Sequence, residues 1–322
     1  MNGSVPLGYL TAAGERALGI LPLTWFVLAL SILVCAIITV LWWVGVWRTH
    51  AGHGGSEETR AVQVQRGPSG VRWIGIGLLI TIVPLLVTLA WTMATLAATS
   101  GPPENPGVVL DVTGHQWWWE VQYDAAEADQ TFITANEIHI PVNTRVLVRL
   151  HGADVIHSFW VPKLTGKTDT IPGQTNVAWL QARNPGRYLG QCTEYCGWQH
   201  AHMALEVVAE PPQEFARWRA QQLRPAPEPT GQAQQRGEAL VEYRCGLCHQ
   251  VRGTLAASRA APDLTHLKSR RMIAAGLLPN SPATLGGWIE GAQGFKPGCL
   301  MPNQNLSADE LGNVVAYLES LQ

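Results

Sequence analysis

The chain has 322 residues, of which 47% are hydrophobic and 14% are charged, and its formal net charge at pH 7 is -2. This length is enough for two or three domains. The composition is too apolar for one ordinary soluble domain, so part of the chain is expected to lie in lipid. No run of lysine and arginine occurs, which argues against nucleic acid as a partner, because a nucleic-acid binder needs a basic face to neutralise phosphates.

Two long apolar segments near the start of the chain predict a pair of transmembrane helices. The segments 17–47 and 73–103 contain no charged residue, and each exceeds the ~20 residues that a spanning helix needs. We expect helices over about 20–47 and 73–98, with Pro84 tolerated inside the second. The alternative for the first segment is a cleavable signal peptide, although the apolar part of such a peptide spans only ~7–15 residues.

The arginines between the two segments predict their orientation. The short loop carries Arg48, Arg60, Arg66 and Arg72, whereas only Arg16 precedes the first segment. Short loops rich in lysine and arginine stay in the cytoplasm. We therefore expect both termini, and everything after about residue 103, on the extracytoplasmic side.

The segments that follow alternate with the two-residue period of half-buried strands. In EIHIPV (137–142) and RVLVRL (145–150) the apolar residues share one face, and similar strands continue the pattern. An all-β sandwich or barrel is predicted over about 107–210, followed by a short helix over about 213–222.

A composition shift marks the next boundary. The segment RPAPEPTG predicts a semi-rigid linker over 224–231, because it has three prolines and no large apolar residue. Beyond it the pattern is helical. Near the end, Ser307 and Glu310 form a capping-box signature before an apolar stripe of Leu311, Val314, Val315 and Leu318.

The stretch QCTEYCGWQHAHM (191–203) is unusually rich in metal-ligating side chains. Cys192 and Cys196 could form a disulfide in an oxidising compartment, and cysteine with histidine would also suit zinc. The placement of His200 and Met203 favours copper, since thiolate and thioether ligands together select a soft, redox-active ion.

A second motif, CGLCH (245–249), has the C-x-x-C-H pattern of covalent c-type haem attachment. A C-x-x-C pair alone is also a redox or zinc motif. The context favours haem, because Met301 follows in the proline-flanked segment KPGCLMPN, before a final amphipathic helix. Met301 is one candidate for the distal ligand of the haem iron, and His266 is the alternative.

These motifs together resemble a known family. The spacing C-x3-C-x3-H-x2-M is similar to the dinuclear copper (CuA) loop of subunit II of haem-copper cytochrome c oxidases. The family's upstream histidine motif is matched by HSFWVP (157–162), and its aromatic cluster by GHQWWW (114–119). With CGLCH, the chain as a whole resembles the bacterial members that carry a C-terminally fused cytochrome c domain.

The resemblance implies a set of site residues. For CuA it implies bridging thiolates, terminal imidazoles, a weak thioether ligand and a backbone carbonyl. The bridging thiolates are Cys192 and Cys196, and the terminal imidazoles are His157 and His200. The weak thioether ligand is Met203, and the backbone carbonyl is that of Glu194. The side chain of Glu194 is further implied to reach a magnesium site at the boundary with the catalytic subunit.

For haem c, the resemblance implies thioether bonds from Cys245 and Cys248, His249 as the proximal ligand and Met301 as the sixth ligand. Trp117 takes the position at which electrons enter, with Trp118 in place of the family's usual tyrosine.

The predicted fold class is a membrane-anchored multidomain chain. It has a two-helix transmembrane hairpin within 1–103, an all-β cupredoxin-like domain over 104–223 and an all-α cytochrome c domain over 232–322. The resemblance implies location in the bacterial inner membrane, with the cofactor domains in the periplasm.

The implied function is electron transfer within a terminal oxidase. Electrons would pass from an external cytochrome c, or another membrane-bound donor, to subunit I, where oxygen is reduced. Subunit I, subunit III and membrane lipid are the implied partners. A quinol oxidase subunit is disfavoured, because that class lacks copper ligands. A CuA-containing nitric oxide reductase subunit stays open as the alternative.

Some residues stay outside the implied sites. Gly77 occupies the place of a family glutamate at the mouth of a proton channel, which puts a proton-entry role in doubt. Cys299 has no assigned role. Four further histidines are expected to be bystanders, at the surface or behind the ligands. They are His115, His139, His151 and His202.

Overall fold

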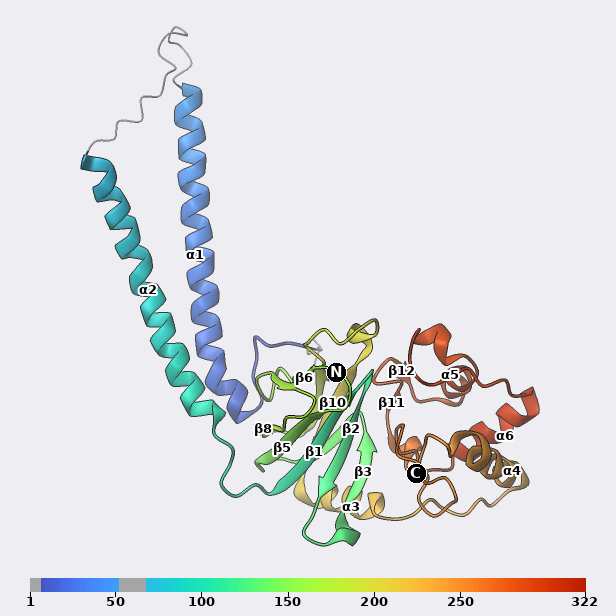
Figure 1. The fold of residues 1–322 in the computed structure, drawn as a ribbon. Helices are drawn as coiled ribbons and strands as arrows, with labels where there is room; N and C mark the ends of the chain where they lie inside the picture. Colours follow the sequence, from blue (N-terminus) through green and yellow to red (C-terminus); the bar gives the residue numbers. More distant parts are fainter. Residues whose placement is uncertain (1–6, 52–67) are drawn as a thin grey trace. The chain divides into compact units, whose positions relative to one another are not determined.

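The computed structural model describes residues 7–51 and 68–322 (Figure 1). The chain divides into two compact units. One is Gly19–Gly101, and the other is Pro102–Gln322 together with the chain up to Leu18. Arg60 and Arg66, which entered the prediction of orientation, lie outside the described residues.

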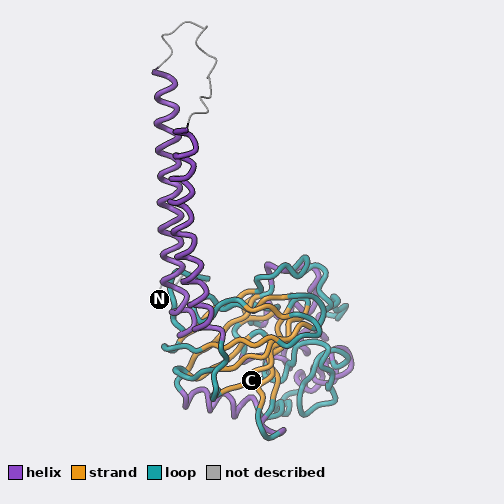
Figure 2. The backbone as a smooth tube through the Cα atoms, turned by 60° about the vertical axis from the view of Figure 1, so that its left-hand side comes forward, coloured by secondary structure: helices purple, strands orange, loops and turns teal. Residues whose placement is uncertain are grey.

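The first unit contains α2 (Pro68–Ser100) and all of the long helix α1 (Glu15–Ala51) except its first four residues. They run side by side (Figures 1 and 2), and the rings of Phe26 and Trp91 pack with their centroids 5.2 Å apart. Both are long and apolar enough to cross a membrane. Each extends a few residues beyond the predicted span, because helical hydrogen bonding continues past the point where apolar side chains give way to polar ones.

The β domain, which comprises β1–β10 and α3, consists of packed sheets. A five-stranded sheet has the order β3-β2-β1-β5-β8, a three-stranded sheet has the order β4-β10-β9, and β6 pairs with β7. The strands are β1 Val108–His115, β2 Trp118–Asp124, β3 Phe132–Ala135, β4 Glu137–Pro141, β5 Val146–Gly152, β6 His157–Phe159, β7 Thr168–Thr170, β8 Asn176–Leu180, β9 Gly186–Gln191 and β10 Ala204–Glu210. Helix α3 (Pro212–Gln222) follows, where a short helix was predicted.

The predicted alternation is confirmed in β5, where Val146, Val148 and Leu150 are fully buried in the core between the sheets. Strand β4 differs from the expectation, because all five of its residues are buried, including Glu137 and His139. A half-exposed strand was predicted there. A two-residue period reports one apolar face and carries no information about what covers the other.

His139 shows what covers that second face. Its ring stacks on Trp218 of α3, with the centroids 4.1 Å apart. Its Nδ1 lies 2.9 Å from a carboxylate oxygen of Glu210, and its Nε2 lies 2.9 Å from one of Glu137. His139 was expected at the surface or behind the ligands, and it lies in neither place. It is a buried side chain held between two carboxylates.

The helical domain comprises α4 (Gln232–Leu240), α5 (Pro282–Phe295) and α6 (Ala308–Leu318). The π-helical turn Val241–Cys245 continues α4, and β11 (Met272–Ile273) and β12 (Leu278–Pro279) form a hairpin. Helix α4 crosses α6 closely at Gly237, where a Cβ atom would lie 2.0 Å from the carbonyl oxygen of Asn313. Only glycine fits such a backbone approach.

The capping box predicted at the start of α6 is present, with Ser307 accepting from the amide of Glu310 and Glu310 bonding back to Ser307. Helix α5 was not predicted. Its four glycines lower its helix propensity. The signal that could have found it is Ser281 followed by Pro282, because Ser281 caps this helix in a second box.

We expect the ion pairs of His139 to make stability pH-dependent. Burial alone would lower the pKa of His139, but its bonds to Glu137 and Glu210 raise it above the usual value of about 6.5. A raised pKa contributes stability that is fully present below about pH 6.5 and is lost as pH rises through the folded pKa.

His139→Gln should therefore destabilise the β domain by about 1.5–3 kcal/mol at pH 6, and by less at pH 9. Thermal unfolding of the full chain in detergent at both pH values measures the difference. His151→Gln, at a half-exposed histidine paired with Asp111, is the matched control. An equal loss at the two pH values would contradict the ionic role.

Candidate metal centre and haem attachment site

The six residues implied as CuA ligands converge on one buried point of the β domain. The Sγ atoms of Cys192 and Cys196 lie 3.8 Å apart. The second sulfur lies 3.6 Å from Nδ1 of His200 and 3.9 Å from Sδ of Met203. The carbonyl of Glu194 lies 3.3 Å from the first sulfur. A sulfur separation of 3.8 Å is far beyond the ~2.05 Å of a disulfide bond, and both cysteines are free.

The last member, His157, comes from strand β6. Its ligand atom lies within 4.8 Å of the two sulfurs, and all three residues are buried. One backbone hydrogen bond ties the loop to this strand, and a second closes the loop on itself. The amide of Thr193 donates to the carbonyl of Ser158, and the amide of Cys192 donates to the carbonyl of Met203. The loop that follows β9 is therefore folded back over β6.

Asp154 fixes the orientation of the His157 ring. Nε2 of His157 lies 2.8 Å from Oδ1 of Asp154, and backbone amides of Val155 and Gln116 hold that carboxylate in place. The other nitrogen, Nδ1, is buried without a hydrogen-bond partner. A buried, unpartnered nitrogen beside two sulfurs fits a metal ion, because metal-bound histidine typically bonds a carboxylate through its second nitrogen. The sequence analysis did not single out Asp154.

The hydrogen bond between the two sulfurs gives the thiols opposite acidities. It lowers the pKa of Cys192 to about 4 and, together with burial, raises that of Cys196 above its usual value. This hydrogen bond therefore favours the thiolate form of Cys192. A metal ion bound by both sulfurs has to displace the proton of Cys196, and its apparent affinity should fall as pH falls.

Trp117 is bonded directly to the cluster. Its indole Nε1 donates to the carbonyl of Cys196 at 2.9 Å, and Nε2 of Gln116 donates to the same oxygen at 2.7 Å. The ring is 8% exposed. Trp118, on the other side of the chain, stacks on His115 with the centroids 4.4 Å apart.

The other candidates lie outside the cluster. Nδ1 of His202 lies 2.8 Å from the side-chain oxygen of Gln199. His151 pairs with Asp111. The carboxylate of Glu194 is half-exposed and lies 4.0 Å from Nζ of Lys167.

The CGLCH motif follows the end of α4. Nδ1 of His249 lies 2.7 Å from the carbonyl oxygen of Pro262. Because a carbonyl oxygen can only accept, Nδ1 carries the proton and donates this hydrogen bond. Nε2 is then the nitrogen with a free lone pair. Burial lowers the pKa of His249 and keeps the ring neutral, as an iron ligand requires. Cys245 and Cys248 are both free thiols. The donor set fits covalently attached haem.

The two alternatives for the distal ligand differ clearly. His266 is buried with both ring nitrogens against backbone carbonyls, Nδ1 at 2.6 Å from Gln322 and Nε2 at 3.1 Å from Arg224. Met301 is half-buried, and it packs against the core of the helical domain, as Cys245 also does. The geometry disfavours His266, because a backbone carbonyl lies against each of its ring nitrogens.

Comparison with known proteins agrees with both motifs. The profile of the cytochrome c oxidase subunit II periplasmic domain matches residues 124–210, and that of cytochrome c matches residues 234–322. Cytochrome c oxidase subunit 2 of Alkalihalophilus pseudofirmus is 35% identical over 252 residues, which cover 75% of this chain and 72% of the relative. The protein of the same name from Bacillus sp. (strain PS3) is 31% identical, covering 76% and 71%.

Among solved structures, the periplasmic domain of subunit II of cytochrome oxidase (CoxB) of Bradyrhizobium japonicum is 32% identical, with a TM-score of 0.35. That match covers 37% of this chain and 94% of the other. The two full-length relatives decide the family, because identity above 30% extends over more than two thirds of each. The chain therefore belongs to the cytochrome c oxidase subunit 2 family and is a subunit of an oxidoreductase complex, with a cytochrome c domain at its C-terminal end.

Proposed function

We propose that the chain carries electrons from an external c-type cytochrome, or another membrane-bound donor, to subunit I of a terminal oxidase, where oxygen is reduced to water. The observation that supports this most directly is that His157 lies beside the sulfurs of the cysteine loop (residues 191–203). Its buried Nδ1 lacks a hydrogen-bond partner. When bound, CuA in the β domain and haem c in the helical domain would each supply reversible one-electron chemistry.

In this proposal two copper ions would be held in the β domain by the thiolates of Cys192 and Cys196 and the imidazoles of His157 and His200. The thioether of Met203 and the carbonyl of Glu194 would complete the set of ligands. Asp154 sets the tautomer of His157. The sheets hold the ligands still, and little rearrangement accompanies a change of charge.

In the helical domain, Cys245 and Cys248 would form the thioether bonds, with His249 as the proximal ligand and Met301 as the distal one. A histidine and methionine pair raises the reduction potential, which suits donation towards copper. Trp117 would lie on the electron route, because its indole bonds to the carbonyl of Cys196. A magnesium ion at Glu194 would lie at the boundary with subunit I.

The family implies assembly with subunit I. We further propose that α1 and α2 lie in the lipid of a bacterial inner membrane, that subunit III joins the complex, and that both cofactor domains face the periplasm. The predicted domain limits, 104–223 and 232–322 with a linker at 224–231, enter this proposal unchanged. In the structure, no helix or strand occurs between α3, ending at Gln222, and α4, beginning at Gln232.

Removing one sulfur tests the copper assignment. Cys196→Ser should abolish the electron paramagnetic resonance and near-infrared signals of the dinuclear centre, because a hydroxyl cannot bridge two copper ions as a thiolate does. The haem absorbance should stay unchanged. Cys299→Ser, outside the cluster, is the control and should keep both signals. A dinuclear signal that survives in Cys196→Ser would refute the assignment.

Asp154→Asn tests the support behind the ligand. It keeps the shape of the side chain but weakens the bond to Nε2 of His157, and copper affinity should fall about 10–100-fold. Competition with a chelator measures the affinity. Asp169→Asn, at a half-exposed residue 3.9 Å from Lys167, should leave it unchanged. Equal affinity in both variants would remove Asp154 from the site.

The substrate gas separates the proposal from its alternative, a nitric oxide reductase. The purified complex, supplied with reduced cytochrome c, should consume oxygen at a rate at least about tenfold above its rate with nitric oxide. Oxygen and nitric oxide electrodes measure both rates on one preparation. Faster consumption of nitric oxide would assign the chain to the alternative.

A further inference from the structure

The segment Phe295–Met301 of the helical domain lies against the β domain at Trp117. A Cβ atom built on Gly298 would lie 3.8 Å from Cη2 of the Trp117 ring and 3.7 Å from Cε3 of Trp198. Nε2 of Gln199 donates to the carbonyl of Pro297 at 2.8 Å. The segment that leads to Met301 therefore covers the indole of Trp117, which donates a hydrogen bond to the carbonyl of Cys196.

Lys296 forms the centre of this contact. Its side chain is buried, with 3% of the residue exposed. Nζ donates to the carbonyls of Trp117 at 2.7 Å, His202 at 2.8 Å and Ala274 at 3.2 Å. Three donors thus meet three neutral acceptors, and the two shorter bonds cross from the helical domain to the β domain.

The chemistry of a buried cation explains why these bonds matter. Burying an ammonium is costly unless its donors are all satisfied. Burial lowers the pKa of Lys296 to about 8, so the ammonium form with three donors is still the major form at pH 7. Two of its acceptors belong to the other domain, and the fold of the helical domain alone therefore gives no reason to bury it.

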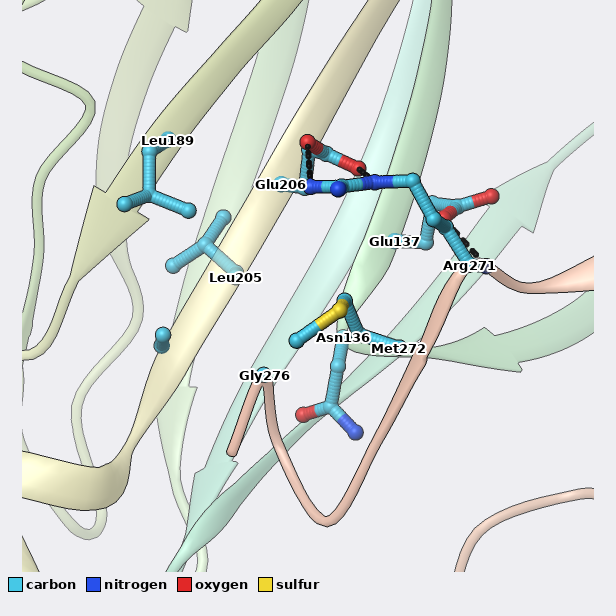
Figure 3. Close-up of a pocket in the computed structure, with 9 residues that line it drawn as sticks. Asn136, Glu137, Leu189, Leu205, Glu206, Arg271, Met272 and Gly276 are labelled. Atoms are coloured by element: carbon cyan, nitrogen blue, oxygen red, sulfur yellow. Dashed lines mark hydrogen bonds and ion pairs between the residues drawn. The ribbon is translucent and has the colours of Figure 1, made fainter. Parts of the chain in front are cut away.

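A second contact joins the same two domains through the β11–β12 hairpin (Figure 3). The guanidinium of Arg271 bonds to both carboxylate oxygens of Glu206, at 2.9 and 3.4 Å. The amide of Ala204 donates to the carbonyl of Ala275 at 3.1 Å. These bonds lie at strand β10, directly after Met203. The Lys296 contact and the hairpin contact together fix how the helical domain is placed on the β domain.

We propose that Lys296 is a positioning residue that clamps the helical domain on the β domain, with the segment before Met301 held against Trp117. This rests on the proposed electron-transfer function. The clamp keeps Trp117 covered by the chain's own helical domain. With haem held by Cys245, Cys248, His249 and Met301 and copper held by the cysteine loop, one electron would move per event. The haem would be oxidised and the copper centre reduced, with no bond made or broken.

The first test uses the unaltered complex and does not depend on activity. Acetylation by acetic anhydride, followed by peptide mass spectrometry, compares each lysine in the native and the unfolded chain. Relative to its unfolded rate, Lys296 should react at least about tenfold more slowly than Lys167, whose side chain is 57% exposed. Reaction of Lys296 as fast as Lys167 would show an open contact and overturn the proposal.

The second test is Lys296→Met, which keeps the length and removes the donors. The matched control is Lys268→Met, because Lys268 pairs with Glu319 inside the helical domain. In Lys296→Met, hydrogen exchange at the amide of Ala204 should speed up at least about tenfold. Electron transfer from haem to copper, followed after photochemical reduction of the haem, should slow by a similar factor.

The haem potential and the copper spectrum of Lys296→Met should both match those of Lys268→Met. A match shows that the slower electron transfer is not caused by loss of fold or cofactor. Wild-type rates of exchange and of electron transfer in Lys296→Met would refute the clamp while leaving the proposed function intact. If the variant fails to keep its cofactors, the acetylation result on the unaltered complex decides. Absence of copper or haem from the unaltered complex would instead refute the proposed function.

Discussion

The candidate metal centre depends on the hydrogen bond between the amide of Thr193 and the carbonyl of Ser158. It ties the cysteine loop to strand β6, and so it brings His157 to sulfurs that lie far along the chain. The bond from Cys192 to Met203 closes the loop on itself. Because both are backbone bonds within a packed sheet structure, they position ligands without needing the metal to gather them. The rigidity expected of an electron-transfer site follows from this.

A continuous chain of hydrogen bonds links this centre to the helical domain. The carbonyl of Cys196 accepts from the indole of Trp117, and the carbonyl of Trp117 accepts from Lys296. Trp117 takes part in both hydrogen bonds, through its indole and through its carbonyl. Polar networks of this kind fix one arrangement, because a misplaced member leaves a buried group unsatisfied. The cysteine loop, the tryptophan and the domain contact are thus one structural unit.

Local patterns predicted whatever depends on neighbours in sequence. The uncharged segments indicated α1 and α2, the two-residue period indicated β5, and Ser307 with Glu310 indicated the start of α6. Spacing within the cysteine loop also predicted which side chains would gather, although the partner His157 came from resemblance.

The rest depends on tertiary contacts that no local pattern records. Asp154 is an ordinary loop aspartate until His157 is folded against it. His139 looks like a strand surface residue until α3 covers it. Lys296 looks like a solvated lysine, since its acceptors at Trp117 and His202 belong to another domain. Burial of a charged group is decided by its partners, and partners distant in sequence are invisible to periodicity.

The short linker explains how a polar contact can hold two domains together. Residues between α3 and α4 are anchored on the helical domain, where the amide of Ala226 donates to the carbonyl of Arg252 and the carbonyl of Arg224 lies 3.1 Å from Nε2 of His266. A tether this restricted keeps the domains at a high effective concentration, so most of the entropy of association is already lost. A large apolar interface is then unnecessary. The bonds from Lys296 to particular carbonyls fix the relative position of the domains more than they add to affinity. The proposed electron route between two fixed sites requires such a defined position.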